Sequence, residues 1–134
     1  MAGSNRSLKG LCLRGQDLTI DDVHSIAFSR RRVSVTNRSQ ILDRLKSAEK
    51  LVENAVETQK KVYGVTTGFG SMADKVVPSE QAEASQANLL AFLSSGTGRP
   101  LDASHVRATM LLRANMFLRN ASGVRIEIIE RLVK

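Results

Sequence analysis

The chain has 134 residues, of which 42% are hydrophobic and 25% charged, and its formal net charge is +7 at pH 7. This length suits a single domain with one modest core, and no apolar run is long enough to cross a bilayer. A single cysteine, Cys12, and two histidines exclude an intrachain disulfide and a clustered zinc site. The first residues are small and polar with no apolar segment after them, so we expect a soluble, cytoplasmic protein without a metal.

Short strands and one helix are expected in the first part of the chain. We predict that residues 1–7 are disordered and that Leu8–Arg14, which alternates weakly in polarity before a glycine, forms a short strand. Cys12 lies between two leucines of that strand, which favours a buried or half-buried apolar residue over a nucleophile. Thr19 is placed to cap a short helix with two aspartates in its first turn, and Val33–Val35 is a second extended segment.

Further helices are expected downstream. Apolar residues recur every three or four positions over Ser39–Lys61, which predicts a long amphipathic helix. A loop over residues 63–77 follows, and a Pro-Ser pair then starts a helix that ends near Ser95 at a glycine-rich turn. An aspartate caps the next helix, Ala103–Arg119, and Val124–Val133 has the apolar spacing of a last helix.

These elements indicate a mainly α-helical fold with a few short strands near the amino terminus, in a single domain or a fragment of one. The chain divides into residues 8–62 with the strands and the long helix, a loop at 63–77, and helices over 78–134. The apolar period continues through Arg131–Lys134 without a capping residue, so we expect the front part of a longer polypeptide. A complete non-catalytic module whose last helix is covered by a partner chain is the alternative.

The loop that begins at Tyr63 has the composition of a reactive site. Tyr63–Gly70 reads YGVTTGFG, in which glycines let the backbone approach a ligand closely and β-branched residues stiffen the positions between them. For the same reason we place Gly70 among the substrate-binding residues. Taken alone, the segment fits a reactive loop and an ordinary tight connection equally well.

The positive charge raises the possibility of nucleic-acid binding, with Arg30–Arg32 as the densest basic run. The other basic residues are dispersed along helix faces and many have acids three or four positions away. A stacking platform is also missing, since the chain has no tryptophan and one tyrosine. We favour a solvated cationic surface and keep a basic nucleic-acid binder as the weakest alternative.

Four segments together resemble one known family. They are YGVTTGFG at Tyr63–Gly70, QANLL at Gln86–Leu90, RAN at Arg113–Asn115 and ASGVRIE at Ala121–Glu127. In this order and spacing they resemble the amino-terminal part of the aromatic amino acid ammonia-lyases and aminomutases. The resemblance covers roughly residues 8–134 and implies the amino-terminal segment of the helical ammonia-lyase fold, which is like that of fumarase and aspartase.

The resemblance implies roles for three side chains. Tyr63 matches the loop tyrosine that acts as acid/base in removing a β-proton from the amino acid, a step a phenol performs only where its surroundings favour the phenolate. Phe92 and Leu93 match the positions that line the pocket for the aromatic ring, although their helical pattern alone favours plain core residues. A leucine at the second position implies an apolar ring, because a polar ring substituent would lack a partner there. Phenylalanine is therefore the expected substrate.

The family's electrophile, 4-methylideneimidazole-5-one (MIO), forms by cyclisation of an Ala-Ser-Gly tripeptide. Ala121-Ser122-Gly123 has this composition, but its context matches the family's upstream Ser-Gly-Val-Arg segment. We therefore assign these residues a structural role, with Ser122 as a candidate helix cap. The resemblance places the MIO group elsewhere in a full-length enzyme, so this chain should hold no cofactor and be inactive alone.

The leading hypothesis is the front part of a phenylalanine ammonia-lyase that gives trans-cinnamate. Its partners would be the amino acid substrate, the rest of the lyase polypeptide and the sister subunits of a homotetramer, with no nucleic acid or membrane. A phenylalanine aminomutase of the same family, and a helical interaction module derived from it, are the alternatives.

Overall fold

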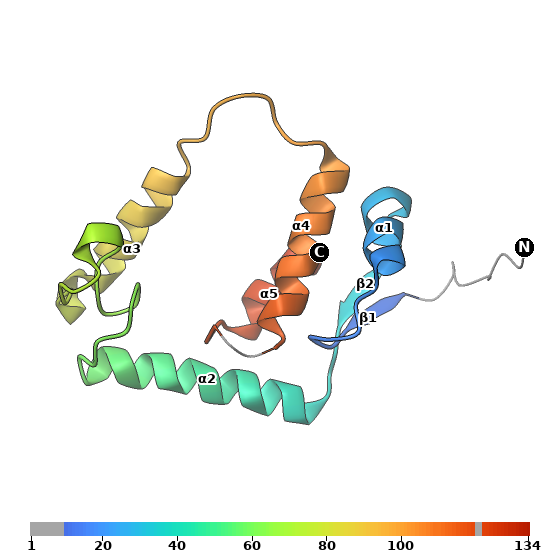
Figure 1. The fold of residues 1–134 in the computed structure, drawn as a ribbon. Helices are drawn as coiled ribbons and strands as arrows, with labels where there is room; N and C mark the ends of the chain where they lie inside the picture. Colours follow the sequence, from blue (N-terminus) through green and yellow to red (C-terminus); the bar gives the residue numbers. More distant parts are fainter. Residues whose placement is uncertain (1–9, 120–121) are drawn as a thin grey trace, which may run out of the picture. The chain divides into compact units, whose positions relative to one another are not determined.

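The computed structural model describes residues 10–119 and 122–134, so the predicted disorder of residues 1–7 lies outside the described part (Figure 1). The described residues are mainly helical with two short strands, which confirms the predicted fold class. No helix among them is long and apolar enough to span a membrane. The elements are β1 (Leu11–Leu13), α1 (Ile20–Ser29), β2 (Val33–Val35), α2 (Ser39–Glu57), the 3-10 helix η1 (Gly70–Met72), α3 (Ser79–Leu93), α4 (Ala103–Phe117) and α5 (Ile126–Val133).

The described chain forms two compact units. The first comprises the described residues up to Glu49 together with Pro100–Lys134, and the second comprises Lys50–Arg99. The first unit is therefore built from two separate stretches of sequence. The second unit contains the tyrosine loop and α3, the segments to which the sequence assigned the site.

The strands of the first unit form a parallel pair. Leu11 lies opposite Val33 and Leu13 opposite Val35, with α1 as the crossover between the strands. Leu13 is buried and Leu11 packs against the core. The expectation that Cys12 is buried or half-buried is wrong, because strand alternation turns it away from its two neighbours and leaves it exposed.

Helix α1 begins at the predicted cap. The Thr19 hydroxyl accepts from the Asp22 backbone nitrogen at 3.1 Å, and the Asp22 carboxylate accepts from the Thr19 nitrogen at 3.3 Å. A hydrogen bond from the Thr19 hydroxyl is the main cause that lowers the pKa of Asp22 below its ordinary value of 3.8. Arg31, 2.7 Å away, lowers that pKa further, while partial burial opposes both.

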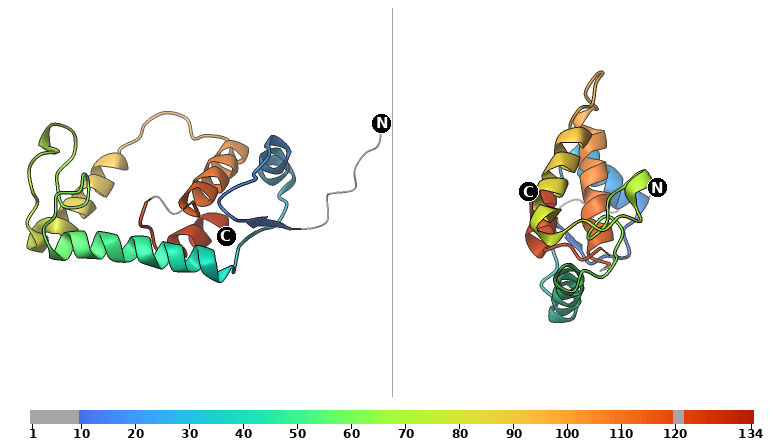
Figure 2. Two further views of the ribbon diagram at one scale, coloured as in Figure 1. Left: turned by 60° about the horizontal axis from the view of Figure 1, so that its bottom comes forward. Right: turned by 90° about the vertical axis from the view of Figure 1, so that its left-hand side faces the viewer.

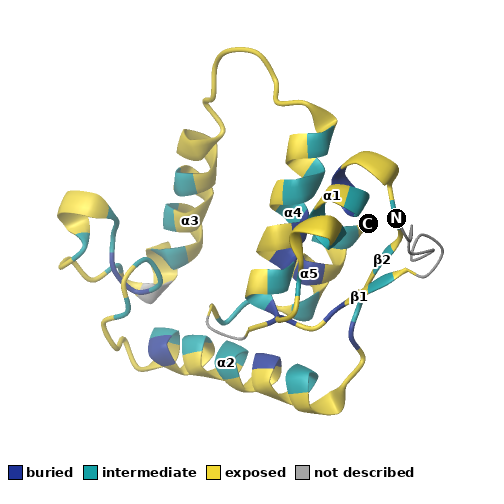
Figure 3. Ribbon diagram, turned by 45° about the vertical axis from the view of Figure 1, so that its right-hand side comes forward, coloured by how far each residue is buried: buried dark blue, intermediate teal, exposed yellow. Residues whose placement is uncertain are grey.

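Helix α4 contacts both α1 and α5, and Figure 2 shows the three helices beside one another. Arg107 of α4 donates from Nε to the carbonyl of Ala27 at 2.8 Å, which ties the two helices at the end of α1. The buried apolar residues of this unit gather between these elements (Figure 3). Ala27 is among them, and the core cluster consists of Leu13, Ile26, Leu45, Leu111, Ala114, Leu118 and Ile129.

The β1–α1 turn lies directly against the end of α4. Gly15 donates its backbone N–H to Oδ1 of Asn115 at 3.0 Å, and its φ is +82°. A Cβ at Gly15 would lie 2.8 Å from the carbonyl carbon of Leu118, so only glycine fits this approach. Asn115, from the RAN segment, is thus a structural residue of this unit.

Several helix ends differ from the sequence expectation. Helix α2 ends at Glu57 because Gln59 adopts a φ of 51° and Lys60 donates back to Ala55, which closes the helix early. Helix α3 ends at Leu93 rather than near Ser95. The cap of α5 is Arg125, so the expectation that Ser122 caps that helix is wrong.

Candidate functional site

The tyrosine loop is closed at its base by a buried threonine. Thr66 is 2% exposed, and its hydroxyl donates to the Lys60 carbonyl at 2.5 Å and accepts from the Val62 nitrogen at 2.9 Å. The nitrogens of Val65 and Thr66 both donate to the Val62 carbonyl at 3.0 Å. These bonds satisfy buried polar groups and hold the turn that carries Tyr63 in one shape.

A second set of bonds closes the far side of the loop. Thr67 and Val76 form an isolated antiparallel bridge, with η1 between them. Gly68 donates to the Lys75 carbonyl at 3.1 Å. The Thr67 hydroxyl, on a side chain that is also buried, accepts from the Gly64 nitrogen at 3.3 Å. The loop is therefore a hydrogen-bonded structure rather than a slack linker.

Tyr63 stands out from this scaffold. The residue is 65% exposed, and its ring meets the ring of Phe69 edge-on, with the centroids 6.1 Å apart. Its hydroxyl oxygen accepts a hydrogen bond from the Gly70 nitrogen at 3.4 Å. The main chain of the same loop therefore supplies a hydrogen-bond donor to the phenol. The phenol is thus accessible, supported by its own loop and provided with one donor.

The two loop glycines that flank this arrangement serve different purposes. Gly64 has a φ of 70°, and a Cβ there would lie 2.9 Å from Cε1 of Phe69. Gly70 has a φ of 57° but open space where a Cβ would stand. Gly64 is therefore required by packing, whereas the space beside Gly70 leaves room for a ligand next to the Tyr63 oxygen.

Phe92 and Leu93 are the last two residues of α3 and are 75% and 67% exposed. They are therefore not core residues of the described chain, although the helical pattern alone favoured that interpretation. The structure brings Tyr63 and Gly70 together, while Phe92 and Leu93 adjoin each other on a separate element of the same unit. A link from α3 to the loop comes from Gln86, whose Nε2 donates to the Gly64 carbonyl at 3.1 Å.

The sequence predicts only a stiffening, β-branched role for Thr66 and no role for Gln86. Both lie in the segments that carried the resemblance, and both have polar side chains next to glycine-rich or apolar neighbours. Their partners are backbone groups four to twenty-two positions away, and a sequence pattern does not specify such pairings.

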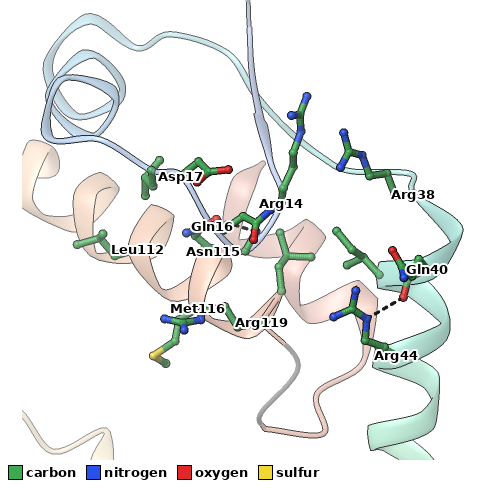
Figure 4. Close-up of a pocket in the computed structure, with 14 residues that line it drawn as sticks. Arg14, Gln16, Asp17, Arg38, Gln40, Arg44, Leu112, Asn115, Met116 and Arg119 are labelled. Atoms are coloured by element: carbon green, nitrogen blue, oxygen red, sulfur yellow. Dashed lines mark hydrogen bonds between the residues drawn. The ribbon is translucent and has the colours of Figure 1, made fainter.

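A cleft of about 670 Å³ in the first unit is a second candidate site (Figure 4). Four arginines line it, among polar residues and a single aspartate, Asp17. The side chains suit an anion rather than proton transfer, since the lining holds no histidine, cysteine or tyrosine. Within residues 10–119 and 122–134, no group of histidine, cysteine or acidic side chains is placed to hold a metal ion. The arginines are Arg14, Arg38, Arg44 and Arg119.

The Ala-Ser-Gly tripeptide is only partly described. Ala121 lies outside the described residues and Ser122 is exposed. Gly123 has a φ of 59° and lies three residues before the first residue of α5. In the basic run at Arg30–Arg32, Arg31 pairs with Asp22, whereas Arg30 and Arg32 are exposed.

Comparison with known proteins identifies the family. A family model described as aromatic amino acid lyase matches residues 18–134. The chain belongs to this family. The membership expected from the four sequence segments is thereby confirmed.

The chain resembles relatives that are named for different substrates. The phenylalanine ammonia-lyase of Nostoc punctiforme is 45% identical over 117 residues, which are 87% of this chain and 21% of that protein. The histidine ammonia-lyase of Caldanaerobacter subterraneus is 39% identical over 127 residues, which are 95% of this chain and 25% of that protein. The chain thus spans about a fifth to a quarter of the length of these relatives.

Solved structures agree on the fold. An ergothionase from Treponema denticola has a TM-score of 0.85 at 28% identity, covering 93% of this chain and 25% of that one. A tyrosine aminomutase from Streptomyces globisporus has a TM-score of 0.84 at 29% identity, covering 93% of this chain and 23% of that one. Proteins that are named for different substrates therefore share this fold, so the fold alone does not identify a substrate.

Proposed function

We propose that this chain supplies the acid/base tyrosine and part of the aromatic pocket of an enzyme that eliminates ammonia from L-phenylalanine to give trans-cinnamate. The main observation behind this proposal is that Tyr63 is exposed on a loop whose shape is fixed by buried threonines. Membership of the aromatic amino acid lyase family supports this assignment.

In this proposal Tyr63 moves the proton. Its oxygen accepts a proton from the β-carbon of the substrate, the electrons of that C–H bond form the Cα–Cβ double bond, and the C–N electrons leave with the amino group. The Gly70 N–H, 3.4 Å from the Tyr63 oxygen, holds that oxygen in position on the loop. The open space at Gly70 accommodates the substrate beside it.

The amino group also needs activation, and in this family the MIO group supplies an electrophile for it. The described residues of this chain do not fit that group well: Ser122 is exposed, at a turn that leads into α5. We therefore assign this chain no part in activating the amino group, and we expect it to be inactive by itself.

The preference for phenylalanine rests on Leu93 and Phe92. Both are apolar, and a substrate hydroxyl or imidazole placed against them would lose its hydrogen bonds to water without replacement. The 45% identity to a phenylalanine ammonia-lyase agrees with this preference. A phenylalanine aminomutase is the second candidate, which the backbone match to a tyrosine aminomutase favours.

The remaining parts of the proposal concern the assembly. We place the chain in a cytoplasmic homotetramer, with the rest of the lyase polypeptide and sister subunits as partners. Elimination then requires those partners, because the described residues provide one acid/base and part of a pocket.

A chimera tests the proposal. The segment of the Nostoc punctiforme phenylalanine ammonia-lyase that matches this chain is replaced by residues 18–134, and the product formed from phenylalanine is identified by chromatography. Trans-cinnamate supports the lyase, and β-phenylalanine supports the aminomutase. A folded tetramer that shows the absorbance of the MIO group but forms neither product would refute both.

Light scattering on the 134-residue chain tests the interaction-module alternative. A monomer that unfolds cooperatively would argue against a module that depends on a partner chain.

A further inference from the structure

We propose that Gln86 is a positioning residue that fixes Tyr63 relative to the face of α3 that carries Leu93. The inference rests on the proposed function for its catalytic consequence, but its structural part stands on the contacts of the second unit alone. Gln86 lies on α3 and is tied to a residue twenty-two positions earlier, next to Tyr63.

The first step concerns Gly64, the residue after Tyr63. Its N–H donates to the Thr67 hydroxyl at 3.3 Å, and its carbonyl accepts from Nε2 of Gln86 at 3.1 Å. Both peptide groups of Gly64 are therefore held, one by the loop itself and one by α3. Since the first of these peptide groups is joined to the Cα of Tyr63, rotation at Gly64 would redirect the phenol. A glycine at a φ of 70° has the freedom to rotate unless such bonds restrain it.

The second step concerns the geometry of α3. Gln86 and Leu93 are seven residues apart, which places them within about 20° on the same face and about 10 Å apart along the helix axis. Ala82 and Leu89, at four positions before and three after Gln86, are half-buried and lie on the same side. Gln86 is itself exposed, but it lies beside these half-buried residues on a helix whose other residues are mostly exposed.

The two steps together define what Gln86 does. Gln86 joins the Gly64 peptide, next to Tyr63, to the face of α3 that carries Leu93. The distance between the Tyr63 oxygen and the substrate ring therefore depends on Gln86. Reacting groups that are misplaced by about 1 Å lose up to a hundredfold in rate. Loss of Gln86 should therefore lower kcat more than it raises KM.

The chain itself offers a direct probe. Tyr63 is its only tyrosine and it has no tryptophan, so tyrosine fluorescence reports this side chain alone. Gln86→Ala removes the donor and places a good helix former on α3, while Gln86→Glu keeps the size but replaces the donor by an acceptor. Gln81→Ala is the control, since Gln81 is an exposed glutamine of the same helix whose described hydrogen bond uses only its backbone nitrogen.

In the 134-residue chain, we expect a larger amplitude of fast anisotropy decay for Tyr63 in both Gln86 variants than in wild type and Gln81→Ala. Hydrogen exchange at the amides of residues 64 and 65 should accelerate in the same two variants, with helix content by circular dichroism unchanged. Equal anisotropy decay and exchange in Gln86→Ala and Gln81→Ala would overturn the inference.

In the chimera, we expect both Gln86 variants to lower kcat about tenfold with KM changed less than about threefold, and Gln81→Ala to match wild type. A kcat for Gln86→Ala within twofold of Gln81→Ala would overturn the catalytic part. If the unmodified chimera forms no product, the proposed function fails, whereas the fluorescence and exchange measurements still decide the role of Gln86.

Discussion

The hydroxyl oxygen of Tyr63 lies 3.4 Å from the backbone nitrogen of Gly70, seven residues further along the same loop. The loop therefore folds back so that its own main chain supports its reactive side chain. A backbone donor cannot be removed by substitution of a side chain, so the phenol keeps this partner in most variants of the loop. The hydroxyl itself can be removed without touching the scaffold.

Tyr63→Phe should abolish elimination while leaving the fold intact. Removal of a positioned acid/base lowers kcat by about a thousandfold, whereas the exposure of Tyr63 limits the change in unfolding free energy to about 0.5 kcal/mol. Cinnamate formation by the chimera and urea unfolding of the 134-residue chain measure the two effects. A variant that retains more than a tenth of the rate would show that another group removes the proton.

Leu93→His should change substrate preference. An imidazole offers a hydrogen-bond partner to the hydroxyl of tyrosine and disfavours an apolar ring, so the kcat/KM ratio of phenylalanine over tyrosine should fall about tenfold or more. Leu90→His is the matched control, because Leu90 is equally exposed on the same helix at 66%. If both variants change the ratio alike, Leu93 has no special place in the pocket.

Thr66→Val should loosen the tyrosine loop. Valine keeps the shape but leaves the Lys60 carbonyl and the Val62 nitrogen without their partner in a buried site, which costs about 2 kcal/mol. Hydrogen exchange at residues 62–66 measures this loss. Thr58→Val is the control: the Thr58 hydroxyl bonds the Asn54 carbonyl in an exposed position, so its removal should change exchange by less than about 0.5 kcal/mol.

Asp22→Asn should destabilise the first unit in a pH-dependent way. The pKa of Asp22 is lowered in the folded chain, chiefly by the Thr19 hydroxyl and then by Arg31, so its carboxylate contributes stability above the unfolded pKa. That contribution is lost as the pH falls through the folded pKa.

We therefore expect Asp22→Asn to lose about 1 kcal/mol near pH 6, as for loss of a helix cap, and to approach wild type as the pH falls through the lowered pKa of Asp22. Unfolding by urea across this pH range measures the difference. Asp21→Asn, in the same helical turn, should remain within about 0.5 kcal/mol of wild type. A difference that stays constant as the pH falls well below 3.8 would show that charge on Asp22 is not the cause.

The long helices could be predicted because their apolar spacing is a local property of the sequence. The cap at Thr19 could also be predicted, since a capping box needs residues only three positions apart. The helix ends were harder to predict. The left-handed conformation that ends α2 occurs at Gln59, where no glycine marks it in the sequence. Propensity alone would have continued that helix.

The site was predictable only in part. Tyr63 could be singled out from its glycine-rich surroundings, but the roles of Thr66 and Gln86 depend on main-chain groups that approach them only in the folded unit. The two leucines that flank Cys12 do not indicate its environment, because strand alternation turns the Cys12 side chain to the opposite face and leaves it exposed.

The division of the first unit into two stretches, with Lys50–Arg99 between them, has a consequence for synthesis on the ribosome. Leu13 and Ile26 share one core with Leu111 and Ile129. They therefore remain exposed to solvent until the later residues have left the ribosome. The tyrosine loop has no such delay, since its bonds join residues between Lys60 and Gln86. Pulse proteolysis of ribosome-stalled chains should therefore find the loop protected before the segment that precedes it in the gene.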